Sequence, residues 1–126
     1  MNTVAWVLQI VVAVLFLLHG LLFTVAYGAV ARRVEARGRP PSSLPPALRQ
    51  FIGVAELAAA FGLTVPPALH LFSWLAPLAA AGLVLVMVGA SIFHARKSEF
   101  QALAGTVVLG ALAAVTLFLR WQVVPL

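Results

Sequence analysis

The feature that most constrains this chain is a series of four apolar runs, each close to the length that a helix needs to cross a bilayer. A hydrocarbon core about 30 Å thick requires roughly 20 mainly apolar residues per helix. The runs cover about residues 4–31, 49–65, 73–94 and 100–119. Because a helix satisfies its own backbone hydrogen bonds, it is the form such runs take in lipid. We therefore predict an all-α fold, a four-transmembrane-helix up-and-down bundle forming one membrane domain over residues 1–126.

Composition excludes the soluble alternatives. Hydrophobic residues make up 63% of the 126 residues and charged residues only 9%. Water-soluble domains have about 45–50% apolar and about 25% charged residues, so this chain cannot cover a globular surface with polar groups. The sequence has no cysteine, which excludes thiol catalysis, thiolate metal sites and disulfide relay.

The cations lie mainly in two connections between the apolar runs. Five of the eight Lys and Arg residues fall between Arg32 and Arg49, and two more fall in the segment 94–100. The segment 32–48 contains Gly, Ser and two Pro-Pro pairs, so we expect an aqueous loop there. Basic connections of membrane proteins face the cytoplasm. We expect a multi-pass protein of the plasma (inner) membrane, with both basic loops cytoplasmic and both termini outside.

A net charge of +5 by itself would suggest a nucleic-acid partner. Recognition of phosphates needs a basic face on a folded aqueous domain, and no segment here is long enough to form one. Membrane topology already accounts for the basic clusters, so no nucleic acid is predicted as a partner.

Proline and tryptophan set the expected ends of the helices. Pro66 and Pro67 lack amide hydrogens, and we expect the second helix to end before them. Trp6, Trp74 and Trp121 all fall near the predicted outer level, where aromatic belts form at membrane interfaces.

Small residues predict where helices approach one another closely. Ala58 and Gly62 form a small-xxx-small pair, and Gly82 and Gly89 lie seven residues apart. Helices in lipid associate through such faces because small side chains permit close backbone contact. We expect each pair to pack against a neighbouring helix of the bundle.

Glu56 is the first candidate for a functional residue, because it lies about two turns inside the second apolar run. A charged carboxylate at the bilayer centre costs on the order of 3 kcal/mol on insertion scales. Glu56 must therefore be protonated, paired or exposed to a wet cavity. Arg49 lies seven residues earlier on the same helix face, so a structural ion pair between the two is the alternative to a functional role.

His19 is the second candidate, because its expected depth matches that of Glu56. Helix rise places His19 about 16 Å, and Glu56 about 12 Å, from the cytoplasmic ends of their predicted spans. An imidazole bonded to a carboxyl group would lower the cost of burying both and could handle a proton. The alternative is that His19 satisfies a backbone or hydroxyl neighbour. Gln9 is expected to form an interhelical hydrogen bond.

A second group of ionisable residues lies at the predicted cytoplasmic turn after the third run. Ordinary solvation explains such charges, and cation-rich turns also bind anionic lipid headgroups. The members of this group are His94, Arg96, Lys97 and Glu99.

Haem and metal sites are not predicted. Haem ligation by two histidines needs both imidazoles at one depth, but His94 is near the rim, His19 is about 16 Å deeper, and His70 is on the outer side. A metal site needs three or four converging ligands, whereas His19 and Glu56 supply two. The chain has no Asp and no phosphate-binding glycine loop, so no catalytic residue is predicted.

Three blocks of the sequence resemble the DoxX-like family of small four-span membrane proteins. They are WVLQIVVAVLFLLHG, RQFIGVAELAAAFGL and WLAPLAAAGLVLVMVGASIFHARKSEF. Members typically carry an Arg and a Gly before the intramembrane Glu, matched here by Arg49, Gly53 and Glu56. The resemblance implies an up-and-down bundle in the plasma membrane.

A second family motif and one departure from the family pattern bear on the site. The family's His-x-x-Arg/Lys-x-Glu/Asp turn is matched by His94, Lys97 and Glu99. Many members carry a Lys after the glycine of the first span, where this sequence has Phe23 and Thr24. Any role of that Lys is not transferred to this chain. The family takes its name from subunits of quinone-linked sulfur oxidation, and a shared fold does not imply that chemistry here.

Two functions from different classes follow, and whether the chain has enzymatic activity stays open. The first is a non-enzymatic accessory, scaffold or assembly subunit whose intramembrane polar site binds a membrane lipid or a partner, either another membrane protein or further copies of the chain. The alternative is a quinone-binding or proton-handling subunit of a membrane oxidoreductase complex. A quinone is the one cofactor considered, with His19, Gln9 and protonated Glu56 as donors.

Overall fold

The computed structural model describes residues 1–41 and 43–126, so Ser42 of the predicted loop 32–48 lies outside the described residues. Within these residues the chain is all-helical, as predicted. The elements are α1 (Asn2–Phe23), α2 (Tyr27–Ala36), α3 (Pro46–Ala68), α4 (Leu75–Arg96), α5 (Phe100–Phe118) and the π-helix η1 (Leu119–Val123).

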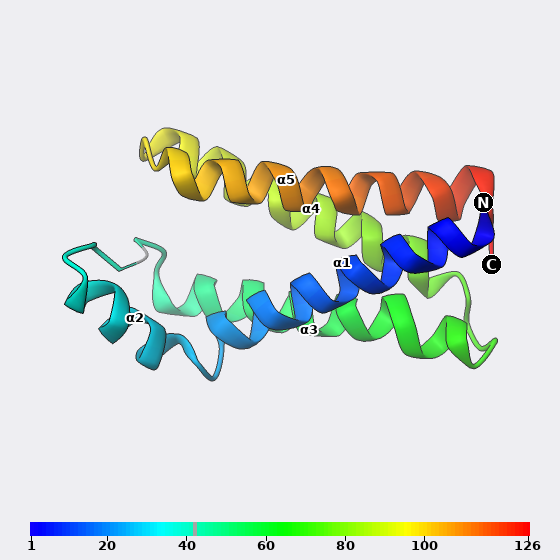
Figure 1. Ribbon diagram of the computed structural model, residues 1–126, viewed down its shortest axis with the longest axis horizontal. Coiled ribbons are helices and arrows are strands. Elements are labelled where there is room, and N and C mark those ends of the chain that lie inside the picture. The colour runs from blue at the N-terminus through cyan, green and yellow to red at the C-terminus, as the bar shows by residue number, and fades with distance from the viewer. Residues whose placement is uncertain (42) are drawn as a thin grey trace.

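The four long helices run antiparallel along the long axis of the molecule (Figure 1). α1 packs mainly on α3 and α5 mainly on α4, so the bundle consists of two helix pairs joined chiefly through α3 and α4. Both termini lie at one end, and α2 and the α4–α5 turn lie at the other. Each long segment is long and apolar enough to cross a membrane, with mean hydropathy between 1.5 and 2.4. The up-and-down bundle is confirmed.

The core lies along the axis of the bundle and is narrow. Its buried apolar side chains come from all four long helices and include Val12, Phe16, Leu63, Leu83, Met87 and Ala113. The outward faces are equally apolar: Phe51 is 67% and Leu85 73% exposed. A surface of this kind suits lipid tails rather than water.

The predicted first span, 4–31, is wrong at its C-terminal end. α1 ends at Phe23, Thr24 leaves the helical conformation, and a separate helix begins at Tyr27. The Thr24 hydroxyl donates a hydrogen bond to the Gly20 carbonyl, 2.8 Å away, and so helps to end α1. The break lets the helix that carries Arg32 and Arg33 turn aside instead of continuing straight from α1.

The predicted loop 32–48 is shorter than expected. Its first residues belong to α2, which runs to Ala36, and its last residues belong to α3. Pro46 is the first residue of α3, where a missing amide hydrogen costs nothing because that position has no intrahelical acceptor. The connection between α2 and α3 is therefore 37–45.

The prediction that Pro66 and Pro67 end the second helix is also wrong. α3 includes both prolines and continues to Ala68. The two missing amides leave the carbonyls of Gly62 and Leu63 without their usual partners four residues on. Leu63 O instead accepts a hydrogen bond from the side chain of Gln9 on α1. A tertiary contact thus supplies a donor that the helix lacks.

The third span was predicted within two residues of its boundaries, and the fourth was predicted correctly at its start but four residues short at its end. α4 covers Leu75–Arg96 against the predicted 73–94, and α5 begins at Phe100 as predicted. The fourth span then continues past 119 as the π-helix η1, which the sequence pattern did not indicate.

Small-residue packing follows the prediction only at Gly62, because Ala58, the other member of that pair, is exposed. Gly62 faces Ala79, since a Cβ built on Gly62 would lie 3.2 Å from the Ala79 Cβ. Nothing lies within 4 Å of a Cβ on Gly82 or Gly89, so the predicted contact of this pair is wrong. The closest approach of a glycine to the backbone of another helix is at Gly20 of α1, where an added Cβ would lie 2.8 Å from the Gly53 carbonyl oxygen of α3.

We expect Gly20→Ala to destabilise the bundle by about 1–3 kcal/mol, because its methyl group meets rigid backbone and forces α1 away from α3. The matched control is Gly89→Ala, which enters open space and should be neutral or stabilising by up to about 1 kcal/mol through helix propensity. Unfolding in detergent micelles measures both. Equal stability of the two variants would contradict close packing at Gly20.

Candidate functional site

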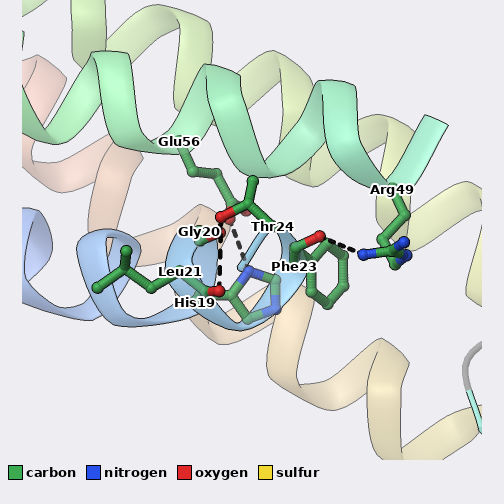
Figure 2. Close-up of polar contacts among 7 residues, drawn as sticks. All are labelled: His19, Gly20, Leu21, Phe23, Thr24, Arg49 and Glu56. Atoms are coloured by element: carbon green, nitrogen blue, oxygen red, sulfur yellow. Dashed lines mark hydrogen bonds and ion pairs between the residues drawn. The ribbon is translucent and has the colours of Figure 1, made fainter. Parts of the chain in front are cut away.

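Glu56 is fully buried inside the bundle and contacts His19. Glu56 lies on α3 and His19 on α1, and their side chains point toward one another (Figure 2). Glu56 Oε2 is 2.7 Å from His19 Nδ1 and shares a hydrogen bond with it. The other carboxyl oxygen, Oε1, is buried and has no hydrogen-bond partner among the described residues. The expected contact between the two helices is present.

Arg49 does not pair with Glu56. Its Nη1 donates a hydrogen bond to the Phe23 carbonyl (Figure 2). Its guanidinium lies 3.8 Å from the centre of the Tyr27 ring. Phe23 O belongs to the last turn of α1, whose carbonyls lack intrahelical partners and carry the negative end of the helix dipole. Arg49 therefore caps α1, and the alternative of an Arg49–Glu56 ion pair is wrong.

A cavity of about 740 Å³ lies at the α2 end of the bundle, and His19 lines it. The His19 side chain is 28% exposed, so it connects the buried Glu56 carboxyl to this space. Most of the lining is apolar. The apolar lining residues include Phe23, Leu44, Ile52, Met87 and Leu109.

His94 lines the same cavity from α4, and it too contacts a glutamate. His94 Nδ1 is 3.4 Å from Oε1 of Glu99, which also accepts a 2.9 Å hydrogen bond from the Ser43 hydroxyl. The other members of the predicted turn, Arg96 and Lys97, are exposed.

The two imidazoles share one arrangement. Each is held through Nδ1 by a glutamate, one at the α1–α3 pair and one at the α4–α5 turn. A carboxyl partner on one ring nitrogen fixes the orientation of the ring and leaves Nε2 to bind something else. Sequence analysis predicted no contact or shared site for His19 and His94, whereas in the fold both line one cavity.

The large depth difference predicted between His19 and His94 is wrong. Because α1 ends at Phe23, His19 is only four residues, or about 6 Å, from the end of its helix. His70 follows α3 at the opposite end, beyond Ala68. The described residues contain no group of three or more His, Cys, Asp or Glu positioned to hold a metal ion.

Gln9 is not part of the cavity but of a second polar cluster near the termini. It is fully buried and donates through Nε2 to Leu63 O, while its Oε1 accepts a hydrogen bond from Nε of Arg120. Gln9 therefore forms the interhelical bonds expected of it. It has no place in a site with His19 and Glu56, since it does not line the cavity.

Arg120 is the residue that sequence reasoning missed. It lies in the π-helix η1 and is 2% exposed, although the sequence pattern presents it only as an isolated cation after the fourth apolar run. Its Nη1 donates to Asn2 Oδ1 at 3.0 Å and to Val124 O at 3.2 Å, and its guanidinium is 4.9 Å from the Trp6 ring centre. The available signal was that the hydrophobic segment continues beyond Arg120 to Val123, which places the Arg within the span.

We expect the cost of Gln9→Leu to fall by about 0.5–1.5 kcal/mol in a Pro67→Ala background, because the substituted alanine restores the amide donor for Leu63 O. The loss of the Arg120 contact is the same in both backgrounds and cancels. Pro66→Ala is the matched control, since it restores a donor for Gly62 O and should show no coupling to Gln9. Unfolding free energies in detergent measure this cycle, and equal coupling for both prolines would contradict the proposed role of Gln9.

Comparison with known proteins identifies one family. Residues 7–116 match the profile of the DoxX-like family, and this range contains both glutamate–histidine pairs. No curated protein and no solved structure gave a significant match. Because the match covers most of the chain and the fold has four membrane-spanning helices, this multi-pass membrane protein belongs to the DoxX-like family.

Proposed function

We propose that this protein is a non-enzymatic accessory module that holds an amphiphilic molecule of the membrane in the cavity between its helix pairs. The observation that carries the proposal is that His19 and His94 line one cavity, each held by a glutamate. Paired imidazoles offer polar contacts to a headgroup, and the apolar wall suits an alkyl or ring system.

The size and composition of the cavity support this proposal. Ligand sites in proteins typically measure about 300–1,000 Å³ and combine an apolar lining with a few placed polar groups. Here the volume is about 740 Å³. The polar groups face a space formed by helices rather than by a soluble domain, so the natural ligands are molecules dissolved in the bilayer.

The partners and membrane location are part of the same proposal. The ligand is a membrane lipid or similar amphiphile, and an accessory role implies either a second membrane protein or further copies of this chain as the partner. We place the protein in the plasma membrane with its cation-rich end in the cytoplasm. Both basic connections lie at the end of the bundle opposite the termini. Because basic connections are retained on the cytoplasmic side, this arrangement supports cytoplasmic loops and outer termini.

Filling the cavity tests the proposal. Gly105 lines the cavity, and nothing lies within 4 Å of a Cβ built on it, so Gly105→Leu adds volume there without a backbone clash. We expect this variant to reduce photolabelling by a diazirine-bearing long-chain alcohol at Ile52 and Met87 at least about ten-fold. Mass spectrometry of the labelled peptides provides the measurement.

Gly82→Leu is the matched control, because Gly82 is equally open but does not line the cavity. This variant should label like the parent protein. Equal labelling of Ile52 and Met87 in both variants would show that the alcohol reacts from the surrounding lipid, which would contradict ligand binding in the cavity.

A quinone-binding or proton-handling role is the second candidate, and the His19–Glu56 hydrogen bond favours it. The bond can carry its proton on either atom. With the proton on Glu56, Nδ1 accepts and Nε2–H donates to a ligand carbonyl. With the proton on Nδ1, the carboxylate accepts and Nε2 takes a hydrogen bond from a ligand hydroxyl. The pair therefore suits both a quinone and its quinol.

Infrared spectroscopy distinguishes this candidate from simple lipid binding. We expect the complex with decylubiquinone to have a protonated-carboxyl band that is lost in the complex with decylubiquinol, because the two ligands require opposite tautomers of His19. Glu56→Gln should abolish the difference and Glu99→Gln should retain it. A difference spectrum unaffected by Glu56→Gln would remove the support for proton handling.

A further inference from the structure

The α2 helix lies outside the bundle and has its own apolar stripe. None of its residues is buried, and it packs chiefly against α1. At ten residues it is about 15 Å long, too short to span a bilayer. Its half-buried positions Tyr27, Val30, Ala31 and Val34 follow the i, i+3, i+4, i+7 spacing of one helix face.

The opposite face of α2 is basic and exposed. Arg32 and Arg33 lie on it, and Arg37 and Arg39 follow directly in the connection to α3. The ion pairs of the described residues both involve histidine, so none of these arginines is paired with a carboxylate. Glu35 is the one acid of α2.

The α4–α5 turn adds two exposed cations to the same end of the molecule. Arg96 and Lys97 are exposed there, and the hydrogen bond from Ser43 to Glu99 joins the turn to the α2–α3 connection. Figure 1 shows α2 and this turn at the same end of the bundle. This end of the molecule thus has more cations than acids. Among the described residues, the cations here that form no ion pair with a carboxylate are Arg32, Arg33, Arg37, Arg39, Arg96 and Lys97.

We propose that α2 is an interfacial helix that binds the anionic lipid headgroups of its leaflet through Arg32 and Arg33. α2 begins where the α1 span ends, which places it at the level of the headgroups. Its apolar stripe faces the bundle and the acyl boundary, and its arginines meet phosphates. A short amphipathic helix with a basic face binds membranes in this way. Val34 and Arg39 border the cavity, but Arg32 and Arg33 do not line it, so binding of headgroups by these two arginines can be tested independently of the ligand proposed there.

A unique reporter on α2 tests the proposal, since the chain has no cysteine of its own. Ala29 is exposed on α2, and a spin label on Ala29→Cys reports the mobility and aqueous exposure of the helix in nanodiscs. We expect mobility and exposure to a polar relaxation agent to be at least about three-fold lower in phosphatidylcholine mixed with phosphatidylglycerol than in phosphatidylcholine alone. About 1 M NaCl should remove the difference, because it screens charges beyond about 3 Å.

Two charge variants complete the test. Arg32→Gln with Arg33→Gln should abolish the dependence on phosphatidylglycerol, and both arginines are exposed and form no ion pair among the described residues. Glu35→Gln, on the same helix, should retain or strengthen it because it removes a negative charge. Dependence that persists without both arginines, or equal exposure in both bilayers, would overturn the proposal.

Soluble competitors separate the membrane surface from other anions. Glycerol phosphate, which carries the phosphate without the lipid, should not displace the helix from the anionic bilayer. Poly-glutamate added to protein in pure phosphatidylcholine should leave the label unchanged. Ordering of the label by poly-glutamate alone would identify an acidic protein segment as the occupant and overturn assignment of a lipid surface.

Discussion

A carboxyl group buried among membrane-spanning helices requires a polar neighbour, and the arrangement of α1 against α3 meets that requirement. Glu56 is fully buried and its contact is His19. The contact needs the two helices to come close, and they do so at Gly20, adjacent to His19, and Gly53, one turn before Glu56. Because neither glycine has a side chain, the two helices cross closely enough for His19 and Glu56 to lie within hydrogen-bond distance.

The same requirement organises the opposite end of the bundle. Pro67 deprives Leu63 O of its helical donor, Gln9 supplies one, and the other end of the Gln9 amide accepts from Arg120. The two hydrogen bonds of the Gln9 amide tie α1 to α3 and η1, although Nη2 of Arg120 is buried without a partner among the described residues. A buried polar group without such a partner would cost several kcal/mol in lipid, so these bonds fix the register of helices whose apolar faces would otherwise pack in many ways.

Sequence patterns predicted most of the architecture and only part of the site. Length and hydropathy were enough for four spans, because the bilayer thickness sets helix length whatever the helices contact. The break after Phe23 was not predicted, since no Gly or Pro marks it and the apolar run continues to Ala31. Estimating the depth of His19 from the wrong helix end then separated it from His94.

Composition and spacing along one helix are enough to show that the chain spans a membrane, where its cations gather and which residues are too polar to lie against lipid. Which polar groups contact one another became known from the packing of the helices. It paired Glu56 with His19 rather than Arg49, buried Arg120, and placed His94 on the same cavity as His19. Those contacts depend on how each helix is rotated about its axis and on the angle at which helices cross. Side-chain packing between helices sets both, and no periodic pattern along the sequence reveals them.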